Sequence, residues 1–538
     1  MREGLMMDDY PLSLTAIATR AELYAPRRPV TFRRPDGSVG RLTLGECAER
    51  AHRLAGALRA AGIGPGDPVA TLMWNQPEHL EAYFALPAMG ALIHTLNPRL
   101  HPDELSFIVN DAEDRAIIVD GSLLDVFESF SDARAFSPVI VVHHEGDDDL
   151  PEGYVDYEQF IADAEPLAWP EPHERAAAAI CYTSGTTGRP KGVVYSHRAL
   201  VLHSIVGGLP DANDLCSQDV ILPVVPMFHA NAWGLIYSAA LLGAGLALPG
   251  PKLDAVSVLD LMQEARVTRS AGVPTVWMAV QEALDAEPDR WDLSALSGLL
   301  VGGSAVPPSL LRGMDRHGLT IVQGWGMTET SPLASVCRLP AELADADPET
   351  QIAYRARQGT SLPMIELRAR SDDGQLIPWD DTAMGELEVR GPWVAKAYLG
   401  GAGAEKFTDD GWFCTGDIVT LNAEGNIRIC DRSKDLVKSG GEWISSVDLE
   451  NLLMSHEDVA EAAVIAIPDE KWGERPLAVV VPREGSAPDP ESLREHLAAQ
   501  YAKWQIPERF EFVDEIPRTA TGKFKKTTLR EQFVDTAV

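Results

Sequence analysis

Hydrophobic and polar positions along this chain follow two alternating patterns. Short apolar runs at residues 68–72, 116–119 and 138–142 are typical of strands buried on both faces of a sheet. Longer stretches, such as residues 44–61, have helical spacing. Because strands and helices alternate, the sequence predicts an α/β fold with largely buried sheets.

The pattern changes near residue 385. Residues 385–430 contain short strands separated by turns, as at 425–429, which indicates a smaller β subdomain. From Asp431 onward a compact unit follows, with strand-like runs at 462–466 and 477–481. Strands and helices are both expected in this last unit.

The least polar stretch, residues 220–251, contains no Asp, Glu, Lys or Arg. Pro223, Pro226 and His229 interrupt it and leave only residues 232–248 as a continuous apolar run. A membrane-spanning helix needs ~20 apolar residues. We therefore predict a buried strand, a turn that lines a pocket and a core helix instead of a transmembrane segment.

Length and charge exclude some classes of partner. At 538 residues the chain is too long for one core and should form several domains. It carries 46 Lys and Arg residues against 80 Asp and Glu residues, a formal net charge of −34. This balance disfavours binding to nucleic acid and to anionic lipid. We interpret it as a solubilising surface, with adaptation to salt as the alternative.

The six cysteines form no CxxC pair and have no accompanying histidine cluster, which argues against a metal cluster or a disulfide framework. Free thiols suit a reducing cytoplasm. The first residues have no apolar core of signal-peptide length. We therefore expect a cytoplasmic protein.

Residues 182–192, YTSGTTGRPKG, combine three glycines, small hydroxyl residues and two cations. Exposed N–H groups, hydroxyls and cations bind phosphate oxygens, so we predict a polyphosphate-binding loop. It is not a Walker loop, because Pro190 and Gly192 stand where Gly and Ser or Thr are required. A flexible surface loop is the alternative.

Four further segments follow in order: QGWGMTET at 323–330, WFCTGD at 412–417, DRSKDLVKSGGE at 431–442 and PRTATGK at 517–523. With the glycine-rich segment they resemble the AMP-forming acyl-CoA synthetases of the adenylate-forming superfamily. The resemblance covers essentially the whole chain. Within the family it is greatest to medium- and long-chain fatty acyl-CoA synthetases.

The resemblance implies two domains. A large N-terminal domain, residues 1–430, would hold the ATP and acyl pockets in helix-covered sheets and a small β subdomain. A small, mobile α+β domain, residues 431–538, would carry the catalytic lysine and rotate about Asp431 as the hinge. The resemblance also implies a homodimer, with residues 7–16 as an exchanged arm.

Lys523 is the strongest catalytic candidate, because it matches the family's adenylation lysine on a loop that contains Thr and Gly. A lysine ammonium suits phosphate and carboxylate oxygens. By spacing alone it would be a surface lysine, since Lys525 and Lys526 follow closely. The other catalytic candidates are Glu329 and His229.

The resemblance also assigns the nucleotide and metal contacts. Thr183 and Glu329 match the family's Mg²⁺ ligands, and a few hard oxygen donors suit this ion. Asp417 matches the acid that binds ribose, and Trp325 stands where many relatives have an adenine-stacking Tyr. The alternatives are a helix cap for Glu329 and a turn residue for Asp417. The residues implied for ATP and CoA are Thr183, Ser184, Gly185, Thr186, Thr187, Gly188, Lys191, Gly303, Gln323, Gly324, Trp325, Thr328, Asp417, Arg432, Lys434, Lys438, Gly440, Gly441 and Trp443.

The acyl pocket is implied at the segment PMFHANAW, residues 226–233. Relatives that bind amino acids have an acidic residue near the position of His229, and its absence here implies an uncharged acyl group. Trp233 matches a tryptophan that gates the fatty-acyl tunnel, with a core tryptophan as the alternative. The residues implied for this pocket are His229, Ala230, Trp233, Gly302, Gly303 and Gly326.

The resemblance thus implies an ATP-dependent acid:CoA ligase that uses Mg²⁺ and releases AMP and pyrophosphate. Its expected substrates are ATP, coenzyme A and an uncharged aliphatic acid of medium or long chain. Three alternatives stay open. They are a ligase for bulky or ring-bearing acids that runs one half-reaction, an enzyme that loads a carrier protein, and a nucleotide-binding protein without catalysis.

Overall fold

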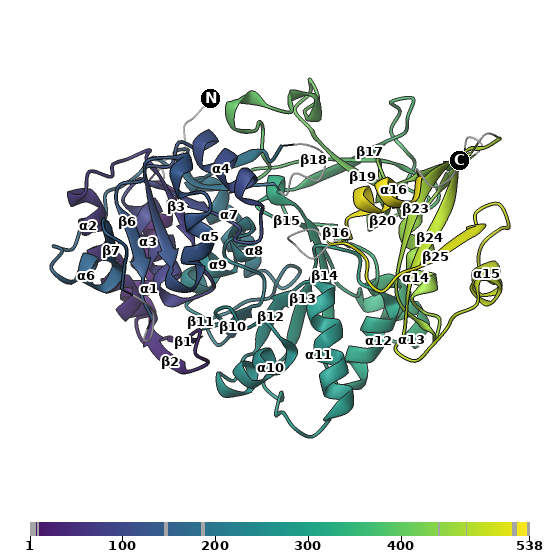
Figure 1. Ribbon diagram of the computed structural model, residues 1–538, viewed down its shortest axis with the longest axis horizontal. Coiled ribbons are helices and arrows are strands. Elements are labelled where there is room, and N and C mark those ends of the chain that lie inside the picture. The colour runs from purple at the N-terminus through teal and green to yellow at the C-terminus, as the bar shows by residue number, and fades with distance from the viewer. Residues whose placement is uncertain are drawn as a thin grey trace.

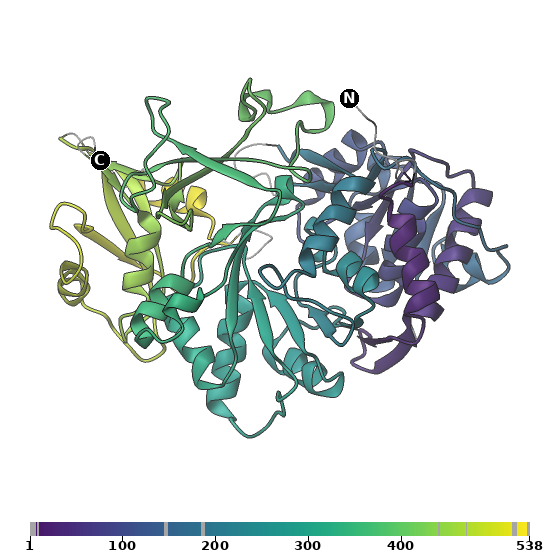
Figure 2. The same ribbon diagram turned by 180° about the vertical axis from the view of Figure 1, so that it is seen from behind.

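The structure, a computed structural model, describes residues 7, 10–144, 149–183, 189–439, 442–469, 471–518 and 524–534. Two large sheets with helices between them form most of the molecule, and two smaller sheets follow toward the C-terminus (Figure 1). The first helices and the C-terminal unit lie at opposite ends, which the view from behind also shows (Figure 2). The predicted α/β architecture is confirmed.

One large sheet has seven strands, and all neighbours are parallel except the last pair, an antiparallel hairpin. The apolar runs predicted as strands form three of its members, and nearly all of their residues are buried. In spatial order the strands are β7 (Tyr154–Asp156), β6 (Val139–Val142), β5 (Ala116–Asp120), β3 (Pro68–Leu72), β4 (Leu92–Thr95), β8 (Ala177–Tyr182) and β9 (Gly192–Ser196).

The other large sheet has nine strands. Its centre is parallel, so the carboxyl ends of its middle strands meet at one edge, where ligands bind in open α/β sheets. In spatial order the strands are β16 (Thr360–Ser361), β15 (Leu333–Cys337), β14 (Ile321–Gly326), β13 (Gly298–Val301), β12 (Arg269–Gly272), β10 (Val220–Pro223), β11 (Gly245–Leu248), β1 (Pro29–Arg33) and β2 (Val39–Thr43).

Helices α1, α2, α3, α7 and α9 contribute to one apolar core with both large sheets, so they lie between them. Helices α10, α11 and α12 cover the opposite face of the nine-stranded sheet, and α4 and α5 cover that of the seven-stranded sheet. The helices of this part are α1 (Leu14–Tyr24), α2 (Leu44–Ala60), α3 (Pro77–Ala88), α4 (Pro102–Asp111), α5 (Leu124–Glu128), α6 (Tyr157–Ala162), α7 (His197–Gly207), α8 (Ala230–Trp233), α9 (Leu235–Leu242), α10 (Ala255–Glu264), α11 (Pro274–Ala286), α12 (Pro308–Arg316) and α13 (Pro348–Arg355). Short 3-10 turns are η1 (Gly121–Leu123), η2 (Ser131–Ala133), η3 (Thr328–Thr330), η4 (Ala341–Leu343), η5 (Leu399–Gly401) and η6 (Ala404–Lys406).

Local chemistry sets the start of α2, the helix predicted at residues 44–61. The Thr43 side chain accepts the Glu46 N–H, and the Glu46 carboxylate accepts the Thr43 N–H, which forms a capping box. Apolar residues at helical spacing then bury one face of the helix.

A four-stranded antiparallel sheet follows: β17 (Glu366–Arg370), β18 (Gly385–Arg390), β19 (Phe413–Leu421) and β20 (Ile427–Arg432). The predicted β subdomain is present, but it begins at Glu366 rather than at residue 385. The predicted strand at 425–429 instead begins at Ile427, because Gly425 adopts a positive φ in the preceding turn. Asp431 lies inside β20, paired with Ile418, rather than in a linker.

The C-terminal unit has a five-stranded sheet with helices α14 (Ser446–Leu453), α15 (Pro490–Ala498) and α16 (Lys526–Val534). The runs predicted at 462–466 and 477–481 belong to its two long central strands. Its strands are β21 (Val437–Ser439), β22 (Glu442–Ile444), β23 (Val459–Asp469), β24 (Gly473–Pro482) and β25 (Arg509–Phe512).

The apolar stretch 220–251 forms β10, the turn at α8 and helix α9, as predicted, and also strand β11, which was not predicted. Within the described ranges, no helix is both long and apolar enough to cross a membrane. At the N-terminus, the Leu12 N–H donates to Glu174 of the same chain over 3.2 Å, and α1 begins at Leu14. An exchanged arm would therefore end before Leu12.

Candidate functional site

The nucleotide side of the candidate site combines strands from two sheets. Trp325 in β14 donates its indole N–H to Oδ2 of Asp417 in β19 over 2.9 Å, and both residues are buried. The Arg432 guanidinium in β20 lies 2.7 Å from the other oxygen of Asp417. A carboxylate can accept more than two hydrogen bonds. Asp417 therefore keeps acceptor capacity for the hydroxyls of a ribose.

Gln323 lies two residues before Trp325 on β14 and is buried. Its Oε1 has no hydrogen-bond partner among the residues that the structure describes. A buried acceptor without a donor is costly, and an exocyclic amino group such as that of adenine would satisfy it. Gln323, Trp325 and Asp417 thus form a side suited to a nucleoside.

Strands β8 and β9 lead into and out of the glycine-rich segment. At its base the Thr183 N–H donates to Lys191 O over 3.0 Å, and the Lys191 N–H donates to Oγ1 of Thr183 over 3.2 Å. These bonds hold the two ends of the predicted phosphate loop together. The predicted contacts that lie outside the described residues here are Ser184, Gly185, Thr186, Thr187 and Gly188.

Glu329, in η3 directly after β14, is buried beside this hairpin. The Tyr398 hydroxyl donates to its Oε1 over 2.5 Å. The Lys191 ammonium lies 5.1 Å from the centre of the Tyr398 ring, and the Tyr195 hydroxyl in β9 donates to Thr328 O over 2.7 Å. The fold therefore brings Lys191, Thr328 and Glu329 to one place.

Thr183 and Glu329 offer a hydroxyl and a carboxylate, both hard oxygen donors that suit Mg²⁺. In the described part of the chain, no three His, Cys, Asp or Glu side chains gather as a metal cage. A magnesium ion here would be held by few protein ligands and by the phosphates of a bound nucleotide.

The turn after β10, which was predicted to line the acyl pocket, is held by neutral groups around the seven-stranded sheet. Oδ1 of Asn75 accepts the Met227 N–H over 2.6 Å, and the Tyr83 hydroxyl donates to Met227 O over 2.5 Å. Thr95 in β4 donates to Phe228 O over 3.1 Å. These bonds fix the backbone immediately before His229.

His229 and Thr183 both line a cavity of about 340 Å³. The cavity also reaches Phe228 and Tyr182, so it connects the acyl turn with the base of the phosphate loop. The two segments are far apart in the sequence, and the fold brings them to the same cavity.

Residues Ala230, Asn231, Ala232 and Trp233 form a left-handed turn, with φ of 43°, 52°, 48° and 56°. This conformation costs roughly 1–2 kcal/mol for each residue other than glycine. The buried Asn231 anchors the turn, since its Oδ1 accepts a hydrogen bond from the Cys181 thiol over 3.2 Å. Backbone strain of this kind is concentrated at functional sites.

The turn directs the Trp233 ring onto glycine backbone at the ends of β13 and β14. A Cβ added to Gly302 would lie 3.4 Å from Cη2 of Trp233 and 2.7 Å from Gly324 O. A Cβ on Gly303 would lie 3.8 Å from the ring, and one on Gly326 would lie 1.9 Å from Pro332 O. Glycine is therefore required for this close packing.

The predicted hinge residue is buried and strongly bonded. Oδ2 of Asp431 accepts the Ser446 N–H at the start of α14 over 2.7 Å. Lys526, the first residue of α16, lies 2.6 Å from Glu450 and donates to the Ser446 hydroxyl over 2.5 Å. Burial raises the pKa of Asp431, and the nearby Lys526 ammonium opposes this shift.

The remaining predicted contacts lie on the C-terminal unit. The Lys438 ammonium is 5.5 Å from the Trp443 ring centre and 3.7 Å from Asp372, between β17 and β18. Lys438 therefore contacts the loop between β17 and β18 of the four-stranded sheet. Burial lowers the pKa of Lys434, beside Arg432. Gly440, Gly441 and Lys523 lie outside the described residues.

Tyr398 is a site residue that the sequence analysis missed. It stands 69 positions after Glu329, in a segment without a recognised motif, so only the fold reveals their bond. Asn75 and Tyr83 were missed for the same reason, because they reach the acyl turn from elements 144 or more positions away.

Comparison with known proteins locates this geometry in one family. Residues 18–399 match the family described as AMP-binding enzyme, and residues 448–523 match the AMP-binding enzyme C-terminal domain. The chain is 49% identical over 533 residues to a long-chain-fatty-acid–CoA ligase of Thermus thermophilus, covering 98% of this chain and 96% of the relative. It is 41% identical over 530 residues to a 3-methylmercaptopropionyl-CoA ligase of Ruegeria pomeroyi, covering 98% of each.

Solved structures share the fold over nearly the whole chain. The anthranilate CoA ligase AuaEII in complex with anthranoyl-AMP has a TM-score of 0.86 at 25% identity, covering 99% of this chain and 100% of that one. ATP-bound MatB from Rhodopseudomonas palustris has a TM-score of 0.84 at 28% identity, covering 98% and 100%.

Proposed function

This chain belongs to the AMP-binding enzyme family and is an AMP-forming acyl-CoA synthetase, and on that premise we propose that it activates an uncharged aliphatic acid of medium or long chain. The observation that carries the proposal is the packing of the Trp233 ring on the bare backbone of Gly302 and Gly303. Displacing this ring would open space beside the nucleoside side of the site. The neighbouring turn is held by neutral side chains, which suits an uncharged acyl group.

In the first half-reaction, a carboxylate oxygen of the acid attacks the α-phosphorus of ATP. The bond from that phosphorus to the bridging oxygen breaks, pyrophosphate leaves, and an acyl-adenylate remains. Trp325 and Gln323 would hold the adenine and Asp417 the ribose. The ammonium of Lys523 would neutralise charge that develops on the transferring phosphate oxygens.

Thr183 and Glu329 would hold Mg²⁺, and Tyr398 would orient the Glu329 carboxylate. When bound, the ion supplies charge neutralisation at the phosphate oxygens. Lys191 lies on the same side and would add a second positive charge there.

In the second half-reaction, the sulfur of coenzyme A attacks the acyl carbonyl carbon and AMP leaves. We propose that residues 431–538 form a mobile domain that rotates at Asp431 between the two steps, against the domain of residues 1–430. After rotation, Gly440 and Gly441 would leave room for pantetheine, and Lys438 and Trp443 would line its passage.

Two further properties belong to this proposal. The chain would act in the cytoplasm, where its free cysteines stay reduced. It would form a homodimer, in which the exposed Met7 and Tyr10 would contact the second copy. Light scattering at micromolar concentration tests the dimer, and a monomer would contradict it.

The substrate proposal is tested with a panel of straight-chain and ring-bearing acids, each assayed with and without coenzyme A. Acyl-AMP and acyl-CoA are measured separately. We expect acyl-AMP without coenzyme A and thioester with it, at the highest kcat/KM for straight chains. Turnover of ring-bearing acids alone would contradict the substrate class, and acyl-AMP without any thioester would contradict the second half-reaction.

A further inference from the structure

The turn at residues 230–233 is distinguished by the length of its left-handed run. Its φ angles of 43°, 52°, 48° and 56° belong to Ala230, Asn231, Ala232 and Trp233, whereas the other non-glycine residues with positive φ in the described part of the chain stand singly. Residues other than glycine and asparagine enter this region only at a cost in energy, and then as single residues. A run of four persists only where the surrounding structure holds it in place.

One side chain of the turn is clamped from outside it. Oδ1 of Asn231 accepts the Cys181 thiol over 3.2 Å, and the Tyr83 hydroxyl, which also donates to Met227 O, lies 3.2 Å from the same oxygen. Burial raises the pKa of Cys181 to about 11 and also raises the pKa of Tyr83, so both groups stay protonated and can donate at neutral pH. The donors belong to β8 and α3, which lie in the core between the large sheets. Asn231 thus fastens the turn to a buried part of the fold.

The left-handed conformation leaves the other end of the same amide unsatisfied. Asn231 is 1% exposed, and its Nδ2 has no hydrogen-bond acceptor among the residues that the structure describes. A buried donor without a partner is costly. The turn therefore combines backbone strain with an unmet hydrogen bond. Release of the turn would relieve the strain and free this amide to find an acceptor.

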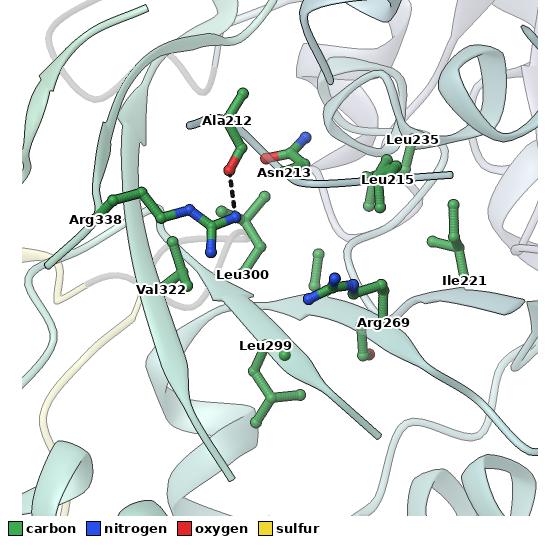
Figure 3. A pocket seen from close by; sticks show the side chains of 13 residues that line it. Ala212, Asn213, Leu215, Ile221, Leu235, Arg269, Leu299, Leu300, Val322 and Arg338 are labelled. Carbon is green, nitrogen blue, oxygen red and sulfur yellow. Dashed lines mark hydrogen bonds between the residues drawn. The ribbon is translucent and has the colours of Figure 1, made fainter. Parts of the chain in front are cut away.

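A right-handed conformation is available next to the turn. Helix α9 begins at Leu235, and Gly234, which joins the helix to the turn, has a φ of 73° and can adopt either hand. Leu235 borders a small cavity, whose lining also includes Ile221 and Leu300 of the nine-stranded sheet (Figure 3). The first turn of α9 therefore has unfilled space beside it and can shift when residues 230–233 change hand.

This change of hand would move the Trp233 ring. Right-handed residues have a φ of about −63°, so the bond from Cα to Cβ of Trp233 would point elsewhere and the ring would leave Gly302 and Gly303. We propose that Asn231 is a positioning residue that holds residues 230–233 left-handed, and that release of the turn opens the acyl pocket. The strain stored in the turn favours this opening. The inference rests on the acid:CoA ligase function, and on the role of Trp233, proposed above.

The test uses the ratio of kcat/KM for tetradecanoate to kcat/KM for butanoate, measured as AMP released in the presence of coenzyme A. A long chain requires that the Trp233 ring moves, whereas we expect the butanoate chain to end before the ring. The ratio therefore reports how readily the pocket opens. Trp233→Ala is the reference variant, and it should raise the ratio because the ring is absent.

Two substitutions at one position separate the side-chain clamp from the backbone strain. Asn231→Ala and Asn231→Gly both remove the acceptor for Cys181 and Tyr83, but only glycine adopts a positive φ without cost. Asn231→Ala should raise the ratio, because the turn is no longer held left-handed. Asn231→Gly should give a ratio lower than that of Asn231→Ala by roughly 5- to 30-fold, since glycine makes the left-handed turn easier to keep.

Ala232→Gly tests the backbone strain with the clamp intact. Glycine removes the cost at a φ of 48°, so the left-handed turn is favoured and the ratio should fall below the wild-type value by roughly 5- to 30-fold. Arg266→Gly is the matched control, because the exposed Arg266 has a φ of 50° just after α10, and it should leave the ratio unchanged. The KM for ATP should stay at the wild-type value in Ala232→Gly, which a general loss of folding would not produce.

The outcomes distinguish this inference from the function on which it rests. If the wild-type protein turns over neither acid, the proposed function fails and the inference fails with it. If both acids are turned over and Trp233→Ala leaves the ratio unchanged, the ring is not the barrier, and the role of Trp233 is wrong. If Trp233→Ala raises the ratio but Ala232→Gly does not lower it, or Asn231→Ala and Asn231→Gly give the same ratio, the strained turn does not control the pocket and the inference alone is overturned.

Discussion

Replacing Tyr398 with phenylalanine removes one hydroxyl group and leaves the aromatic ring in place. In the wild-type protein this hydroxyl donates to Oε1 of Glu329 over 2.5 Å. Burial raises the pKa of Tyr398 above its ordinary value, and the neighbouring Glu329 carboxylate adds to the shift, so the phenol stays protonated and remains a donor. Glu329 is 6% exposed, and water therefore cannot readily replace the lost donor.

The expected loss follows from the charge on the acceptor. A hydrogen bond to a charged group contributes ~1.5–3 kcal/mol, which corresponds to roughly 10- to 150-fold in an equilibrium or rate constant. Groups that orient a metal ligand typically change affinity or activity by about 10- to 100-fold. We expect acyl-AMP formation by Tyr398→Phe to slow within this range and to need more Mg²⁺.

The measurement is pyrophosphate exchange into ATP, followed against Mg²⁺ concentration at saturating acid. Tyr154→Phe is the matched control, because Tyr154 also donates to a glutamate, Glu128, over 2.9 Å, but at an exposed position. Its kinetics should equal those of the wild-type protein. If Tyr398→Phe retains wild-type exchange at every Mg²⁺ concentration, Glu329 is not oriented by Tyr398 for catalysis and the reasoning is refuted.

Four more outcomes are expected. Lys523→Ala should raise the barrier to acyl-AMP formation by about 2–4 kcal/mol and spare thioester formation from supplied acyl-adenylate; equal losses would contradict a two-conformation cycle. Trp233→Ala should alter the acyl-length profile of kcat/KM more than the KM for ATP, and the reverse would remove Trp233 from the tunnel. Asp431→Pro should form acyl-AMP in single-turnover assays but fail in CoA transfer, because proline fixes φ and lacks an N–H; normal transfer would place the hinge elsewhere. Burial lowers the pKa of His203 from 6.5 to about 4. Between these two pH values the imidazole is therefore protonated in the unfolded chain and neutral in the folded chain. His203→Gln should therefore reduce the loss of unfolding free energy between pH 7 and pH 5, in urea titrations, by about 2 kcal/mol; an unchanged loss would mean that His203 is not held neutral.

The strands of the large sheets could be predicted because their signal is local. Residues 68–72 and 116–119 are apolar throughout and buried on both faces, so composition alone identifies them. β17, with the sequence ELRAR, gave no such signal. It is a polar edge strand in which only Ala369 is buried, and its place in the sheet comes from pairing with β18.

The candidate site likewise contains residues that the sequence predicts and contacts that it does not. Asp417, Glu329 and Trp325 could be named in advance, since each lies in a short segment that resembles a motif of the family. The bond between Tyr398 and Glu329 joins parts of the chain that no local pattern relates. Such contacts depend on strand register and loop path, and a single sequence specifies these only through the complete fold.

The contacts around the proposed hinge give a physical reason for the position of the proposed catalytic lysine in the sequence. Lys523 lies three residues before Lys526, which begins α16 and is bonded to Glu450 and Ser446 of α14. Ser446 in turn donates its N–H to Asp431. The proposed rotation at Asp431 would therefore act on α14 and α16 together, because separating them would leave the buried Lys526 and Glu450 unpaired, at a cost of about 3–5 kcal/mol. Lys523 precedes α16 by only three residues in the sequence, so we expect one backbone change at the proposed hinge to move this lysine and the proposed CoA-side residues together with α14 and α16.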